Sequence, residues 1–118
     1  MHELSIASAI LERAKAVSEK NQNARVTKVA VRIGELSGVE SDALRFGFEA
    51  LCKGTPMEVT VLDIEFCKRK QQCQGCGAKF EPESYITTCP RCGGDHSVCI
   101  AGKELDVVFI EIEDSPCA

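Results

Sequence analysis

Two pairs of cysteines have the spacing of a metal site. They read Cys73-Gln-Gly-Cys76 and Cys89-Pro-Arg-Cys92, with twelve residues between the pairs and a glycine directly after each. Each CxxC pair can direct two thiolate sulfurs at one ion, and a hairpin between the pairs completes a tetrahedron. Four thiolates leave no open coordination position, so a zinc ion held by them is structural rather than hydrolytic. The spacing therefore predicts a closed metal site.

Iron is the rival metal for this site. Soft sulfur ligands accept either ion, and knuckles of the CPxCG type also resemble those of rubredoxins. With either metal, ligation would stabilise the fold of the cysteine-containing segment, because so short a segment cannot form a sufficient hydrophobic core of its own.

Four further cysteines and one histidine have no such spacing. Cys52 is interpreted as a small buried apolar residue, and Cys67, Cys99 and Cys117 have no assigned role. His96 follows Cys92 by four positions and can in principle replace a thiolate, but a solvated loop histidine is the expectation.

The second candidate site is the start of the chain, where His2 stands one residue from the free amine. A histidine at position 2 lets the start of the chain present three nitrogens in consecutive chelate rings: the Met1 amine, the His2 amide and a ring nitrogen. The Glu3 amide lies within reach as a fourth. Planar, nitrogen-rich donor sets suit Ni(II) or Cu(II), whose geometry differs from the tetrahedral demand of zinc. The set requires Met1 to stay attached and unacetylated. Taken alone, an exposed His2 and a Glu3 that favours the first turn of a helix are the simpler interpretations.

Two segments have helical periodicity. Residues 3–20 and residues 41–52 each repeat apolar side chains at intervals of three and four. For the second helix, Ser41 is the expected N-cap and Asp42 suits the positive end of the helix dipole. The apolar stripes are formed by Ile6, Ala7, Ile10, Leu11, Ala14 and Val17, and by Leu44, Phe48 and Leu51.

Three segments alternate as half-buried strands do: residues 25–34, 57–66 and 104–113. The last strand is expected to return to the sheet of the first two. The residues predicted to face the core are Val29, Val31 and Ile33 in the first strand, Val59, Val61 and Ile64 in the second, and Val108, Ile110 and Ile112 in the third.

Between the second and third strands the composition changes to Cys, Gly, Pro and short polar runs, as in a metal-organised loop region. The expected fold class is α+β, with a small mixed three-stranded sheet packed with two helices and an inserted zinc-ribbon or rubredoxin-like domain. The expected division is a first domain of residues 1–66, completed by residues 104–118, and an inserted metal-binding domain of residues 67–103.

Composition excludes several function classes. A formal charge of −4 gives no general attraction to nucleic acid or anionic membranes, and the short basic run Lys68-Arg69-Lys70 is expected to be a solvated face. The start of the chain lacks a basic secretory n-region, and no stretch of more than eight residues is free of formal charge. A cytoplasmic protein with reduced thiols is the expectation, which favours metal ligation over disulfides.

Four motifs together resemble the HypA/HybF family of nickel metallochaperones: "MHELS" at the start, "VRIGELSGVE", F-x-F-E at residues 46–49, and CxxC-x12-CPxC. The resemblance covers essentially the whole chain. It implies a non-enzymatic protein that delivers Ni(II) during [NiFe]-hydrogenase maturation, and in some members also serves urease. The implied nickel ligands are Met1, His2 and Glu3, and the implied zinc ligands are Cys73, Cys76, Cys89 and Cys92.

The same resemblance implies partners, namely a GTPase nickel-insertion protein of the HypB type and the hydrogenase large subunit. A monomer or weak homodimer is expected. Some members carry histidines beside the zinc knuckles, whereas here the neighbours are Gly77 and Gly93. A histidine-for-cysteine exchange at the zinc site is therefore not expected.

Three other functions compete with this interpretation. A zinc ribbon could bind nucleic acid through residues 68–70 and Arg91, but the acidic balance and the absence of Trp argue against it. A rubredoxin-like electron carrier would require a visible chromophore. An enzyme is disfavoured because Glu35 and Glu40, the one candidate carboxylate pair, are predicted in a turn where solvated acids are common.

Overall fold

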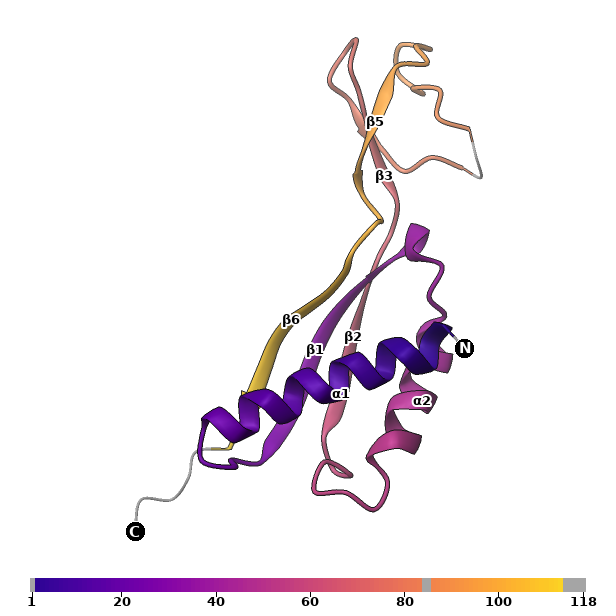
Figure 1. Cartoon of the computed structure of the whole chain (residues 1–118). Coiled ribbons are helices and arrows are strands. Elements are labelled where there is room, and N and C mark those ends of the chain that lie inside the picture. Colours follow the sequence, from indigo (N-terminus) through magenta and orange to yellow (C-terminus); the bar gives the residue numbers. More distant parts are fainter. Residues whose placement is uncertain (1, 84–85, 114–118) are drawn as a thin grey trace.

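The computed structural model describes residues 2–83 and 86–113, in two helices, one 3-10 turn and six strands (Figure 1). In chain order these are α1 (His2–Lys20), β1 (Val26–Gly34), η1 (Glu35–Ser37), α2 (Ser41–Cys52), β2 (Val61–Cys67), β3 (Lys70–Cys73), β4 (Lys79–Phe80), β5 (Ser97–Ala101) and β6 (Leu105–Ile112). No helix in these ranges is both long enough and apolar enough to span a bilayer.

The strands form two separate sheets. In the first, ordered β2-β1-β6, β1 pairs parallel with β2 and antiparallel with β6, so the sheet is mixed as predicted. The second, ordered β4-β3-β5, is antiparallel. The molecule is elongated, 63 × 32 × 16 Å, because the second sheet extends away from the first (Figure 1). The α+β fold class is confirmed, and the exact domain boundaries stay a prediction.

The core lies between the two helices and the first sheet. The helices approach each other at small residues: Ala7 of α1 is fully buried, and a Cβ added to Gly47 of α2 would lie 3.7 Å from the Ala7 Cβ. Phe48 and Leu44 of α2 are 1% and 0% exposed, and Leu51 is half-buried beside them. The helical stripes predicted from the sequence therefore face the core.

Strand β2 differs from the prediction. It begins at Val61 rather than residue 57, and Val59 and Val61 are 56% and 55% exposed. The parallel register pairs Val29 with Leu62, which puts Leu62 and Ile64 on the core side instead. Residues 57–60 form a turn rather than a strand. The inward assignment of Val59 and Val61 was therefore wrong, and that of Ile64 correct.

Strand β6 contains a bulge that the alternating pattern hides. Ala30 pairs with Phe109, and the next residue, Val31, pairs with Val107. Val108 is therefore the additional residue of a bulge and has no pairing partner on β1. A bulge shifts the alternation by one residue. Val108 is consequently 44% exposed, against the prediction, whereas Ile110 and Ile112 pack on the core as predicted.

The start of α2 also differs. Ser41 is the first helical residue and not the N-cap, which is Glu40, and no side chain of its own caps the helix. Instead the Glu40 backbone N–H donates to Oε2 of Glu3 at 3.3 Å. The first turn of α1 is thereby tied to the start of α2.

A narrow neck joins the two sheets. It is formed by Gly34, Arg69, Gly102 and Glu104, where the chain passes from one sheet to the other. The Gly34 N–H donates to the Glu104 carbonyl at 2.7 Å, and a Cβ added to Gly34 would overlap the carbonyl group of Gly102. Gly102 itself has φ +113°, and a Cβ there would lie 2.8 Å from the Arg69 Cα. Glycine is therefore required at both positions.

Gly34→Ala is expected to destabilise the protein by about 3 kcal/mol, the upper end of overpacking costs, because the obstacle is backbone that cannot rotate away. Gly38→Ala gives the contrasting case, since Gly38 has φ +75° with no atom within 4 Å of an added Cβ, whereas Gly34 has φ −85° and is obstructed. That variant isolates the cost of a left-handed backbone, about 1 kcal/mol. Urea denaturation measures both, and equal stability of Gly34→Ala and wild type would contradict the described neck.

Candidate metal sites

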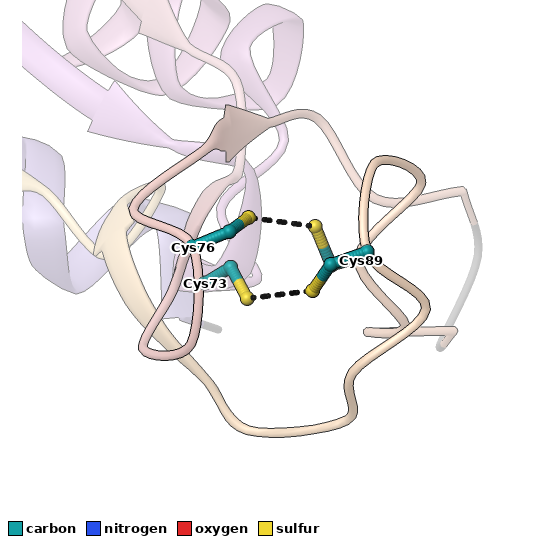
Figure 2. A group of neighbouring side chains, drawn as sticks. Cys73, Cys76 and Cys89 are labelled. Carbon is teal, nitrogen blue, oxygen red and sulfur yellow. Dashed lines mark hydrogen bonds between the residues drawn. The ribbon is translucent and has the colours of Figure 1, made fainter.

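The second sheet brings the four paired cysteines together. The sulfur atoms of Cys73, Cys76, Cys89 and Cys92 all lie within 4.8 Å of one another. Cys73 and Cys92 approach to 3.5 Å, and Cys76 and Cys89 to 3.6 Å. Figure 2 shows the thiols of the two loops facing each other across a shared centre. Residues separated by up to nineteen positions thus form one cluster.

These spacings fit one tetrahedral ion. A metal bound at about 2.3 Å from each sulfur sets the sulfurs about 3.8 Å apart, close to the separations found here. A disulfide needs about 2.05 Å, and all four cysteines are free thiols. Cys73 and Cys89 are 2% and 1% exposed. The cluster is therefore a closed, partly buried sulfur cage with the dimensions of a structural metal site.

Both knuckles are built in the same way. The Gly77 N–H donates to the Cys73 carbonyl at 2.9 Å, and the Gly93 N–H donates to the Cys89 carbonyl at 2.8 Å. Both glycines have positive φ, +78° and +74°, which explains a glycine directly after each pair. A further glycine, Gly94, donates its N–H to the Cys92 sulfur at 3.4 Å.

Hydrogen bonds shift the pKa values of Cys73, Cys89 and Cys92 in different directions. The Cys76 backbone N–H, with further donors that include Cys92, lowers the pKa of Cys73 to about 6, although burial opposes this. The pKa of Cys89 is also lowered, chiefly by the Cys92 backbone N–H. At Cys92 the Gly94 amide lowers the pKa, but the bonds to the three other sulfurs outweigh it and raise the pKa to about 11. Without metal, the cluster therefore keeps at least one proton at neutral pH.

Metal affinity at the cluster is expected to rise with pH. Between the pKa of Cys73, about 6, and that of Cys92, about 11, a bound ion must displace at least one proton. Each displaced proton makes affinity rise about tenfold per pH unit, so acid releases the metal. Competition with a chromophoric chelator at two pH values one unit apart measures this slope, and an affinity independent of pH would contradict it.

The N-terminal candidates lie apart from this cluster. His2 is exposed as the first residue of α1, whose start lies beside α2 (Figure 1), whereas the four cysteines lie at the end of β3 and in the loops between β3 and β5. Met1 lies outside the described residues. The pKa of Glu3 is lowered because its own backbone N–H and that of Glu40 donate to its carboxylate. Glu3 therefore has a structural contact that the sequence did not indicate.

Among the described residues, Cys52, Cys67, Cys99 and His96 lie outside the four-sulfur cluster. Cys52 is 1% exposed, which confirms its interpretation as a small core residue, and burial raises its pKa. Cys67 and Cys99 are partly exposed, and Cys117 lies outside the described residues. His96 is exposed beside Asp95, 3.7 Å away, as expected for a solvated loop histidine.

The basic run and the turn glutamates were both expected to be solvated; Glu35 and Glu40 are exposed as expected, whereas Arg69 is not. Arg69 is 9% exposed, so residues 68–70 are not one solvated basic face. The Glu35 carboxylate accepts a hydrogen bond from the Arg69 backbone N–H at 3.0 Å, which ties the 3-10 turn to the neck. Sequence analysis missed this contact, although the quoted "VRIGELSGVE" motif contains Glu35.

Comparison with known proteins gives a consistent family match. A family model described as "Hydrogenase/urease nickel incorporation, metallochaperone, hypA" matches residues 1–112. Two relatives are each described as "Hydrogenase maturation factor HypA". The protein of Prosthecochloris aestuarii is 36% identical over 113 residues, covering 96% of this chain and 100% of the relative. The protein of Roseiflexus sp. is 39% identical over 115 residues, covering 97% and 94%.

Solved structures share the fold. A solution structure described as that of HypA protein has 25% identity and a TM-score of 0.69, covering 96% of this chain and 97% of that one. The solution structure of the Ni metallochaperone HypA from Helicobacter pylori has 24% identity and a TM-score of 0.60, covering 93% and 96%. Both similarities cover more than nine-tenths of this chain.

Proposed function

The chain belongs to the HypA family of nickel metallochaperones for hydrogenase maturation, and from this premise we propose that its first three residues capture the nickel. The Met1 amine, the His2 amide and imidazole, and the Glu3 amide would supply a planar set of nitrogens. Such a set favours Ni(II) over the tetrahedral zinc of the cysteines. The two sites would thereby select different metals by their coordination geometry, planar for nickel and tetrahedral for zinc.

The single observation that supports this assignment most is that α1 begins at His2. In the first turn of a helix, backbone N–H groups have no carbonyl of a preceding turn to bind. The His2 amide can therefore release its proton to solvent and bind the metal without breaking a helical hydrogen bond, whereas the Glu3 amide would also have to leave its own carboxylate. The positive end of the helix dipole opposes a cation, which keeps the affinity moderate and suits a protein that must release its cargo.

For the cysteine cluster we propose a resident zinc ion with a structural role. Cys73, Cys76, Cys89 and Cys92 would hold it, and the four sulfurs would leave no position for a substrate. When bound, zinc would stabilise the folded second sheet and would not take part in a reaction. A colourless, zinc-containing protein distinguishes this proposal from the iron alternative.

We further propose that the protein acts without catalysis in the cytoplasm, where thiols stay reduced. Its partners would be a GTPase nickel-insertion protein of the HypB type and the hydrogenase large subunit, with urease as a further recipient. Neither the family match nor the relatives support the nucleic-acid or electron-carrier alternatives.

Titration of the zinc-loaded protein with Ni(II) tests the proposed function. The expected result is uptake of one nickel per chain with the absorption band of planar four-coordinate nickel, while the bound zinc stays constant. Nickel uptake that releases an equal amount of zinc would contradict separate sites. Absence of uptake would contradict the N-terminal capture site.

A further inference from the structure

A buried glutamine in the second sheet begins a chain of hydrogen bonds that ends beside the cysteine cluster. Gln71 of β3 is 7% exposed, and its Nε2 donates to the Ser97 Oγ of β5 at 3.2 Å. The Ser97 Oγ in turn donates to the Thr87 carbonyl at 3.1 Å. Thr87 stands two residues before Cys89, the first cysteine of the second pair. This relay of Gln71, Ser97 and Thr87 therefore joins the sheet to the loop that carries the second pair.

The single hydroxyl proton of Ser97 fixes the direction of the relay. The Thr87 carbonyl can only accept, so the Ser97 hydroxyl donates its one proton there and must accept from Gln71. The Gln71 amide nitrogen therefore points to Ser97, and the Gln71 Oε1 is buried without a hydrogen-bond partner among the described residues. A buried polar atom without a partner carries a free-energy cost that an apolar side chain would not incur. Packing alone thus does not account for a glutamine at this position.

The two ends of the loop of residues 86–96 are attached to the sheet by different means. At the later end the attachment is made by backbone, because the Gln74 N–H donates to the His96 carbonyl at 2.8 Å and β5 follows at once. At the earlier end Thr87 lies outside any strand, and the Ser97 hydroxyl supplies the hydrogen bond to it. Attachment of the earlier end therefore depends on side chains rather than on strand pairing.

We propose that Gln71 and Ser97 are positioning residues that determine how long a metal ion stays in the four-sulfur cluster. This inference rests on the proposed structural zinc site. With the relay intact, the backbone before Cys89 is held to β5, and the buried Cys89 sulfur stays 3.6 Å from that of Cys76 (Figure 2). Without the relay, the earlier end of the loop is free to move away from β5, which opens the Cys89 sulfur to a competing ligand.

The size of the effect follows from the length of the path. Residues that orient metal ligands by direct hydrogen bonds commonly change metal affinity about 10–100-fold. The relay orients Cys89 through the backbone that follows Thr87, so the lower end of that range is the expectation. Because the relay must open before Cys89 can leave, its loss is expected to appear in the rate at which the metal dissociates.

Transfer of zinc from the zinc-loaded protein to excess pyridylazoresorcinol, a chromophoric chelator, tests the proposal. Gln71→Ala and Ser97→Ala are each expected to release zinc about tenfold faster than wild type. Ser97→Thr keeps the hydroxyl and is expected to release zinc at the wild-type rate. Gln74→Ala is the matched control and should change nothing, because Gln74 is exposed and its substitution leaves its backbone bond to His96 in place.

A double variant separates positioning from a simple loss of stability. Gln71 reaches Thr87 only through Ser97 in this relay, so Gln71→Ala combined with Ser97→Ala is expected to release zinc no faster than Ser97→Ala alone. Two independent losses of stability would instead multiply their effects on the rate. The absorption of Co(II) bound in place of zinc is expected to be the same in every variant, since all four sulfurs are kept, and it shows that each variant forms its metal site.

Zinc release at the wild-type rate from both Gln71→Ala and Ser97→Ala would overturn the relay and leave the zinc site intact. Equally fast release from Gln74→Ala, or multiplied effects in the double variant, would overturn it as well. A wild-type protein that holds no zinc, or a Cys89→Ser protein that holds it as firmly as wild type, would instead refute the proposed zinc site. The two failures are therefore distinguishable.

Discussion

Replacement of His2 by alanine is expected to weaken Ni(II) binding about 100-fold or more, with zinc content unchanged at one ion per chain. Loss of an outer-shell partner of a metal site already costs about 10–100-fold, and His2→Ala removes a direct ligand, the imidazole nitrogen, while it keeps the backbone amide. The zinc content is expected to stay constant because His2 lies on α1, away from the four sulfurs. Calorimetric titration of the zinc-loaded variant measures the loss.

The chain offers a matched control, because its other histidine, His96, is exposed and close to the cysteine loops. His96→Ala is expected to bind nickel as wild type does. Four residues, Gly-Ser-Gly-Ser, added before Met1 move the amine out of reach of the His2 chelate rings, and this extended protein is expected to match His2→Ala. Wild-type nickel affinity in both His2→Ala and the extended protein would contradict the N-terminal site.

Replacement of Cys89 by serine is expected to unfold the second sheet, β4-β3-β5, and to leave the first sheet folded. Cys89 is 1% exposed, and its loss leaves three sulfurs for a tetrahedral ion. Zinc contributes on the order of 10 kcal/mol in small metal modules, which exceeds what so small a sheet can supply from its own core. Hydrogen exchange should show loss of protection at β3 and β5, while β1 stays protected.

Cys99→Ser is the control for that experiment. Cys99 lies on β5 in the same sheet, partly exposed and outside the four-sulfur cluster, with its thiol donating to the Ala101 carbonyl at 3.2 Å. Its replacement is expected to leave protection unchanged. A Cys89→Ser protein that keeps β3 and β5 protected would show that metal does not hold this sheet together.

Much of the fold was predictable because periodicity and spacing are local signals. The second helix has the predicted bounds, residues 41–52, since a helical stripe is followed at once by "KGTP". The four cysteines converge as their spacing indicated. The return of the last strand beside β1 was likewise evident from its alternation.

Features that depend on pairing were not predictable. The register of β2 with β1 decides which residues of β2 face the core. The apolar run around Val59 and Val61 allows either set of alternating residues to face inward. The Val108 bulge leaves no mark in an alternating sequence. Burial of Arg69 and the Glu35 contact arise only where residues 34 positions apart meet at the neck.

The central claim is that nickel binds through nitrogens of the first residues while a separate sulfur cage holds the distal sheet. X-ray absorption at the nickel K-edge, measured on protein loaded with zinc and one equivalent of Ni(II), tests it most directly. The account predicts a planar nickel coordinated by nitrogen and oxygen atoms alone, with histidine scattering that disappears in His2→Ala. Nickel–sulfur scattering in the wild-type protein would contradict it.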